Sequence, residues 1–188
     1  MQSTPITRRA LTVRLAALPL ALGAATRVWA ADPATGASSA NGLMHTAAAI
    51  RQQIVFEAEP RRVYEALTNE KRFDAVTRLS DGATLLEAAG AKPTMIDGEV
   101  GGTFTLFGGY ITGLNLYMVP NERLVQAWRA GSWKSGQYSI ADFSLVADGA
   151  RTRLAFEHRG FPESEGASLA HGWHEHYWEP LKKYLVRS

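Results

Sequence analysis

The chain has 188 residues, of which 46% are hydrophobic and 20% charged, a composition typical of globular proteins and not of disordered or fibrous ones. It contains no cysteine, which excludes disulfide scaffolds, thiolate metal sites and cysteine nucleophiles. The net charge is +2, but the first thirty residues hold four arginines and no acid. Removing those four from the 20 basic residues leaves 16 against 18 acids, a balance of −2, so we expect no nucleic-acid partner.

Residues 1–30 have the order of regions found in a secretory signal peptide. The pair Arg8-Arg9 precedes an uncharged, mostly apolar stretch at 15–25, and Val28-Trp29-Ala30 then offers small residues at the positions that a signal peptidase reads. The paired arginines resemble the twin-arginine export signal, although an ordinary secretory signal also fits. The apolar stretch is eleven residues long, short of the ~20 that span a membrane. We therefore expect recognition by the export machinery, cleavage after Ala30 or Ala31, a periplasmic or secreted protein and no permanent membrane anchor.

Residues 31–49 are rich in Ala, Gly, Ser and Thr without apolar periodicity, which predicts a flexible linker. The folded domain is expected over 50–188. Its first segment, 50–58, alternates apolar and polar residues as a half-buried strand does. Pro60 then begins a predicted helix over 60–68, and a second short helix is predicted over 70–76.

From residue 83 to 156 the pattern changes to short apolar runs separated by glycine-rich turn signals, and Asp148-Gly149 is typical of a hairpin turn. The C-terminal segment 167–185 predicts a helix, with Pro180 expected to kink it. Its apolar stripe comprises Leu169, Trp173, Tyr177, Leu181 and Tyr184. Strands are predicted over 103–107, 110–119, 124–129, 138–146 and 152–158.

Strands that run together before a long helix predict the α+β class, with the helix covering one face of a curved antiparallel sheet. A helix laid across the concave side of a sheet leaves room for a ligand between them.

The domain contains several short motifs, among them Gly101-Gly102-Thr103-Phe104, Phe107-Gly108-Gly109-Tyr110, Trp128-Arg129, Gly136-Gln137-Tyr138-Ser139, His158-Arg159-Gly160-Phe161-Pro162 and Tyr177-Trp178-Glu179-Pro180-Leu181. In order and spacing these motifs resemble the domain named after the activator of the heat-shock protein 90 ATPase, in the START-like (SRPBCC) superfamily. The resemblance covers about 50–188 and implies a helix-grip fold, a curved antiparallel sheet wrapped around a long C-terminal helix. Superfamily members mostly enclose a cavity for apolar ligands, and a minority are cyclases, dehydratases or hydrolases. The founding members bind the chaperone in the cytosol, a role at odds with an export signal.

The candidate ligand-binding residues are aromatic side chains and one histidine. Most aromatic residues in a small domain simply pack its core, but Trp173 and Tyr177 lie on the helix face that looks onto the sheet. His158 shares the parity of Leu154 and Phe156, which predicts an inward side chain, either structural or a general acid or base. The full candidate set is Phe107, Tyr110, Trp128, Trp133, Tyr138, His158, Trp173 and Tyr177.

No cofactor, metal ion or catalytic residue is assigned. The cluster His171, His174, Glu175 and His176 lacks the His-Glu-x-x-His pattern and is interpreted as a solvated helix face. The glycine pairs match no phosphate-binding loop, and Gly-x-Ser-x-Gly is absent from the sequence.

We expect a non-enzymatic domain that binds a small hydrophobic molecule between the sheet and the C-terminal helix. One alternative is an enzyme that uses His158 with Tyr138 or Tyr177 for proton transfer. The other is a protein-interaction module with an exposed apolar patch.

Overall fold

The structure is a computed structural model, and it describes residues 49–80 and 92–187. The predicted signal segment, 1–30, and nearly all of the predicted linker lie outside these ranges.

Within these ranges, seven strands form one antiparallel sheet in the order β1-β7-β6-β5-β4-β3-β2. Each predicted strand is present, with ends shifted by a few residues. The two-residue strand β2 was not predicted, because so short a segment shows no periodicity. The strands are β1 (Ile50–Phe56), β2 (Met95–Ile96), β3 (Thr103–Leu106), β4 (Ile111–Val119), β5 (Arg123–Ala130), β6 (Ser139–Asp148) and β7 (Arg151–Arg159).

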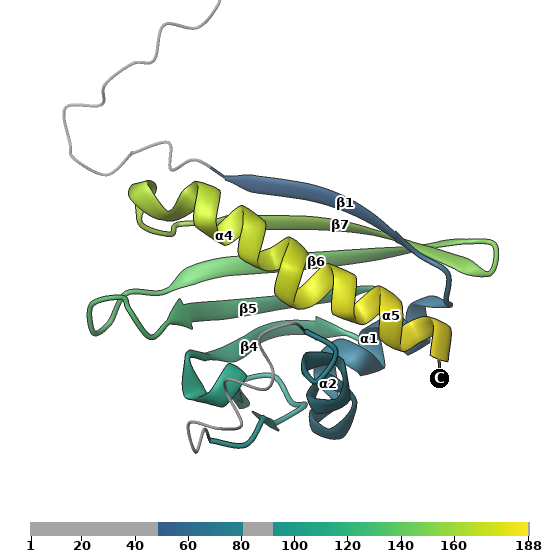
Figure 1. Cartoon of the computed structure of the whole chain (residues 1–188), viewed down its shortest axis with the longest axis horizontal. Coiled ribbons are helices and arrows are strands. Elements are labelled where there is room, and N and C mark those ends of the chain that lie inside the picture. The colour runs from purple at the N-terminus through teal and green to yellow at the C-terminus, as the bar shows by residue number, and fades with distance from the viewer. Residues whose placement is uncertain (1–48, 81–91, 188) are drawn as a thin grey trace, which may run out of the picture. The chain divides into compact units, whose positions relative to one another are not determined.

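The long C-terminal helix runs obliquely across one face of the sheet (Figure 1). It consists of α4 (Gly166–Trp173), a π-helical turn η3 (His174–Trp178) and α5 (Glu179–Arg187). The two helices that follow β1, α1 (Pro60–Thr68) and α2 (Glu70–Thr77), pack against α5. A short 3-10 turn, η1 (Phe107–Gly109), follows β3. A second one, η2 (Glu163–Glu165), directly precedes α4. The predicted α+β architecture, with a curved sheet around the C-terminal helix, is confirmed.

The hydrophobic core lies between the sheet and the C-terminal helix. Along β7 the side chains of Leu154, Phe156 and His158 are buried, whereas the residues between them are more exposed, as their parity predicted. From the helix, Trp173, Trp178 and Leu181 are almost fully buried against this face. Trp173 contacts the rings of Phe156 and Trp128, with centroids 4.4 and 5.5 Å away. Stacked and tilted aromatic rings therefore fill the centre of the domain.

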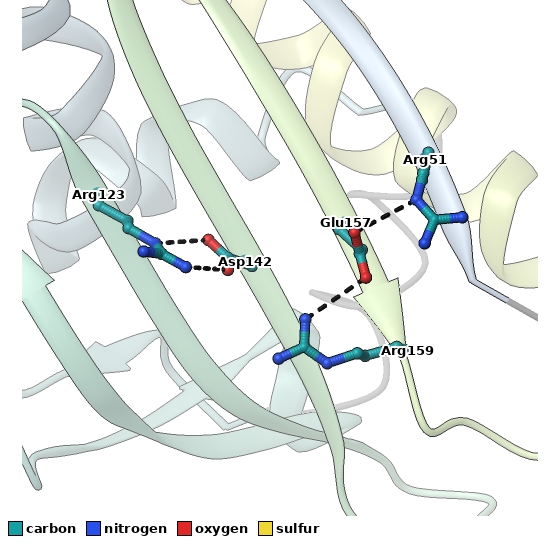
Figure 2. Close-up of polar contacts among 5 residues, drawn as sticks. All are labelled: Arg51, Arg123, Asp142, Glu157 and Arg159. Atoms are coloured by element: carbon teal, nitrogen blue, oxygen red, sulfur yellow. Dashed lines mark hydrogen bonds and ion pairs between the residues drawn. The ribbon is translucent and has the colours of Figure 1, made fainter. Parts of the chain in front are cut away.

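The outer face of the sheet carries ion pairs, two of which join neighbouring strands (Figure 2). Arg123 on β5 donates two hydrogen bonds to the carboxylate of Asp142 on β6, at 3.1 and 2.7 Å. Glu157 on β7 accepts from Arg51 on β1 at 3.3 Å and from Arg159 at 3.4 Å. The Arg123–Asp142 pair is bidentate with a mostly buried carboxylate, and such pairs fix relative position better than exposed single contacts do.

One glycine lets strands β3, β4 and β5 approach closely. A Cβ atom at Gly113 would lie 2.0 Å from the carbonyl oxygen of Ala127 and 2.3 Å from Cζ of Phe104. Phe104 is paired with Gly113 across the sheet, and its ring occupies the space that a side chain would need.

The C-terminal helix contains a wide turn, η3, that the sequence analysis did not predict. The backbone N–H of Glu179 donates to the carbonyl of His174, five residues back, so one extra residue is accommodated just before Pro180. Proline cannot donate to a preceding turn, and its ring crowds the carbonyl four residues back, so the widened turn is the structure's response to Pro180. The extra residue also shifts the buried face, so that Leu185 is buried while Tyr184, predicted in the stripe, is only half-buried.

Candidate ligand-binding cavity

A cavity of about 440 Å³ lies between the C-terminal helix and the sheet. The residues that the C-terminal helix contributes to the cavity are three or four positions apart, so they lie on one face of the helix over three turns. The opposite wall comes from η1, β4 and β5, and the end of α2 and the residues after it close one side. The helix contributes Glu165, Ser168, Leu169, Gly172, Trp173, His176 and Tyr177, and the other walls contribute Thr77, Ser80, Phe107, Tyr110, Ile111, Trp128 and Ala130.

His158 belongs to a series of buried hydrogen bonds beneath the cavity. Nε1 of Trp173 donates to Nδ1 of His158 at 3.0 Å, and an indole nitrogen can only donate, so Nδ1 carries no proton. The proton of the neutral ring is then on Nε2, which lies 2.6 Å from Oγ of Ser139. Ser139 in turn donates to the carbonyl oxygen of Trp128 at 2.9 Å. Each polar group in this series therefore has a partner inside the core.

Burial lowers the pKa of His158 to about 4, so the ring is neutral at neutral pH. Its side chain is fully buried, both ring nitrogens are engaged, and it is not among the residues that line the cavity. Both ring nitrogens thus have partners in the core, which is the geometry of a structural histidine.

Tyr177 supplies a polar group at the inner wall. Its hydroxyl oxygen accepts a hydrogen bond from Nε1 of Trp128 at 3.4 Å. Burial raises the pKa of Tyr177, so the hydroxyl keeps its proton. Among the residues that the structure describes, none accepts that proton. The hydroxyl is therefore a hydrogen-bond donor available at the edge of an otherwise aromatic surface.

Phe107 reaches the cavity from a strained backbone conformation. Its φ is 49°, a left-handed value that is unfavourable for a bulky side chain, and Gly108 and Gly109 that follow also have positive φ. This turn places the Phe107 ring 5.1 Å from the ring of Tyr177 and 5.8 Å from that of Phe73. The glycine pair thus serves to aim an aromatic side chain at the helix, in addition to ending β3.

Three further polar contacts border the cavity. Oε2 of Glu165 accepts from Nε1 of Trp133 at 2.7 Å. Oγ of Ser80 lies 3.0 Å from Nδ1 of His176. The hydroxyl of Tyr110, whose side chain is half exposed at the rim, lies 3.2 Å from Oγ of Ser132.

Of the eight candidate residues, five line the cavity: Phe107, Tyr110, Trp128, Trp173 and Tyr177. The other three do not. His158 lies in the core beneath, Trp133 is buried behind Glu165, and Tyr138 is half exposed just before β6. Ligand contact by any of the eight stays a prediction, and the three outside the lining leave the proposed site.

Sequence reasoning missed Glu165, Gly172 and His176. The helical spacing of three and four that links them to Trp173 and Tyr177 would have included them if extended to polar residues and glycine.

Within residues 49–80 and 92–187, no group of three or more His, Asp or Glu side chains is placed to hold a metal ion. His171 instead pairs with Glu175 at 3.0 Å on the helix surface. No helix in this part of the chain is both long and apolar enough to cross a membrane.

Comparison of the sequence with known proteins identifies the family of this chain. Residues 57–186 match the family model described as "Activator of Hsp90 ATPase homolog 1-like protein". The human "Activator of 90 kDa heat shock protein ATPase homolog 1" is 30% identical over 128 residues, which cover 68% of this chain and 34% of the human protein. The chain thus spans about a third of the length of the curated relatives it matches.

Solved structures show the same fold. An HSP90 activator from Plasmodium falciparum superposes with a TM-score of 0.61 at 22% identity, covering 73% of this chain and 96% of that one. CalU16 from Micromonospora echinospora superposes with a TM-score of 0.57 at 21% identity, covering 73% and 75%. The chain therefore shares the helix-grip fold of these structures, and it belongs to the family of Activator of Hsp90 ATPase homolog 1-like proteins.

Proposed function

We propose that this domain binds a small hydrophobic molecule in the cavity between the sheet and the C-terminal helix. The observation that carries the proposal is the cavity itself, whose volume of about 440 Å³ falls in the range of small-molecule sites. Its walls are mostly aromatic and aliphatic side chains, with few polar groups among them. Apolar surface held open beside a packed aromatic core gains stability when an apolar ligand fills it.

The hydroxyl of Tyr177 gives such a ligand one directional contact. Because it accepts from Trp128 and has a proton to donate, it favours a ligand with a carbonyl or ether oxygen at its inner end. Apolar walls supply affinity in this arrangement, and the single donor supplies orientation.

The test is binding of a neutral fluorescent probe, N-phenyl-1-naphthylamine, to the purified protein, together with native mass spectrometry of the protein as isolated. We expect saturable, one-to-one binding of the probe with quenching of tryptophan fluorescence, since Trp128 and Trp173 line the cavity. An apolar molecule that copurifies should compete with the probe. A protein that neither carries a ligand nor binds the probe would refute the proposal.

We also propose export through the twin-arginine route, followed by cleavage after Ala30 or Ala31. The sequence of residues 1–30 supports this. Replacing Arg8 and Arg9 by lysine should leave the full-length chain in the cytoplasm, whereas the same change at Arg14 and Arg27 should not. Amino-terminal sequencing of the exported protein gives the cleavage site. Export that is unaffected by the Arg8-Arg9 change would contradict the route, and failure to find a processed chain outside the cytoplasm would contradict export.

The human relative, an activator homolog of the 90 kDa heat-shock protein ATPase, favours a second candidate function, stimulation of such an ATPase. Purified domain added to that ATPase should then raise its turnover. This function requires that part of the protein stays in the cytosol. Locating the chain inside or outside the cytoplasm, as in the export test, therefore also separates the two candidate functions.

A further inference from the structure

Glu165 is the one carboxylate among the described residues that line the cavity, and none of those residues is a lysine or arginine. It lies at the end of η2, directly before α4, and is half-buried. Its Oε2 is held by the indole N–H of Trp133 at 2.7 Å. In the part of the chain that the structure describes, Glu165 forms no ion pair, although carboxylates drawn into apolar surroundings are usually paired.

Glu165 is the first of the helix-side residues that line the cavity, and Tyr177 is the last of them. The hydroxyl of Tyr177 and the carboxylate of Glu165 are connected through Trp128, which donates to the hydroxyl, and Trp133, which contacts Trp128 and donates to the carboxylate. A molecule bound in the cavity therefore meets a negative charge at Glu165 and a neutral donor at Tyr177.

Aromatic rings surround the carboxylate end. Trp133, which holds Glu165, contacts Trp128 edge-on with ring centroids 5.5 Å apart, and Trp128 lines the cavity. A carboxylate without a cationic partner attracts a cation. The same carboxylate repels an anion and would force it to lose its hydration without compensation.

We propose that the cavity selects an apolar ligand with a basic amine at one end, whose ammonium group pairs with Glu165. This inference rests on the proposed function and specifies the chemical class of its ligand. A charge-assisted hydrogen bond at this partly shielded position favours an amine over a matched neutral ligand by about tenfold, and over a matched carboxylate by more.

The experiment compares three probes with the same ten-carbon chain, decylamine, decanol and decanoate, by isothermal titration at neutral pH and low salt. The wild-type protein should bind decylamine most tightly, decanol about tenfold more weakly, and decanoate most weakly. Raising the salt concentration should reduce the advantage of decylamine over decanol, because mobile ions screen the pair.

The matched variants are Glu165→Gln and Glu163→Gln. Glutamine at 165 keeps an oxygen that accepts from Trp133 but removes the charge, so the three probes should then bind with similar affinity. Glu163 is an exposed neighbour outside the cavity lining, and its variant should behave as wild type. The salt dependence of the wild type tests the inference even if Glu165→Gln folds poorly.

Decanoate binding as tightly as decylamine, or an amine preference that survives Glu165→Gln, would overturn the charge selection while leaving hydrophobic binding intact. If all three probes fail to bind while N-phenyl-1-naphthylamine binds, this inference is wrong and the proposed function stands. If N-phenyl-1-naphthylamine also fails to bind and no ligand copurifies, the proposed function is wrong, and this inference falls with it.

Discussion

Gly172 allows the cavity to be filled from the helix without disturbing the core. It lies inside α4, where glycine is unfavourable, and it lines the cavity. A Cβ atom built there meets one atom within 4 Å, Cδ2 of His176 at 3.9 Å, which is ordinary van der Waals contact. Gly172→Leu should therefore place four carbon atoms in the cavity and occupy the position of a ligand.

The expected energies follow from helix propensity and burial. Replacing glycine by leucine within a helix gains about 0.5–0.8 kcal/mol. Partial burial of the leucine side chain contributes on the order of 1 kcal/mol more. We expect Gly172→Leu to raise the free energy of unfolding by about 1–2 kcal/mol, measured by urea denaturation, while weakening N-phenyl-1-naphthylamine binding at least about 100-fold, the effect of losing about 3 kcal/mol of contact.

Two controls separate filling of the cavity from a general effect on the helix. Gly172→Ala should stabilise the protein by up to about 1 kcal/mol and still bind the probe, because it adds a single methyl group. Ala167→Leu places the same side chain on an exposed position of α4 outside the cavity, and should change neither stability nor binding appreciably. Unchanged probe affinity in Gly172→Leu, with the protein folded, would show that the probe binds elsewhere and would refute the reasoning.

Three further predictions concern the core. His158→Ala should lower the free energy of unfolding by about 2–4 kcal/mol in urea denaturation, because it leaves the Trp173 indole N–H and the Ser139 hydroxyl without their His158 partner and opens a void. A loss below about 1 kcal/mol would contradict a stabilising role for these two hydrogen bonds. Because burial lowers the pKa of His158 to about 4 in the folded state, the unfolded chain takes up a proton first, so stability should fall by about 3 kcal/mol as the pH drops from about 6.5 towards 4. His158→Gln should reduce that slope in the same titration, and an equal slope would assign it to other groups. Gly113→Ala should cost at least about 2 kcal/mol by thermal or urea unfolding, since its methyl group would overlap the Ala127 carbonyl and the Phe104 ring; a tolerated alanine would show that these strands can separate.

The sequence was most informative where periodicity reports directly on burial. The alternation of Leu154, Phe156 and His158 predicted the inner face of β7, and the turn signal Asp148-Gly149 predicted the hairpin in which Asp148 pairs with Arg151. Trp173 and Tyr177 were placed on the inner helix face for the same reason. Each of these features depends on neighbours a few residues apart, which a single sequence displays.

The parts of the site that were not predicted depend on how distant segments meet. Whether His158 lines the cavity or lies beneath it is decided by the Trp173 indole and the Ser139 hydroxyl, which come from other elements. Glu165 looked like an ordinary polar residue between β7 and a helix, and only the approach of Trp133 shows that it is held at the cavity. Tyr138 shows the limit in the other direction, since an aromatic residue near a strand end can equally face solvent.

The π-helical turn η3 has a consequence for how this chain compares with relatives that lack such a turn. A turn that holds one extra residue is equivalent to an insertion inside a helix, and it rotates the following helix by about 100° relative to an uninterrupted one. A relative with a straight helix would therefore align correctly at Trp173 and at Leu181 only if a one-residue gap fell within His174–Trp178. Without that gap, the alignment would pair the buried positions of α5 with solvent-facing ones, and equivalent residues on the two sides of Pro180 would be assigned incorrectly.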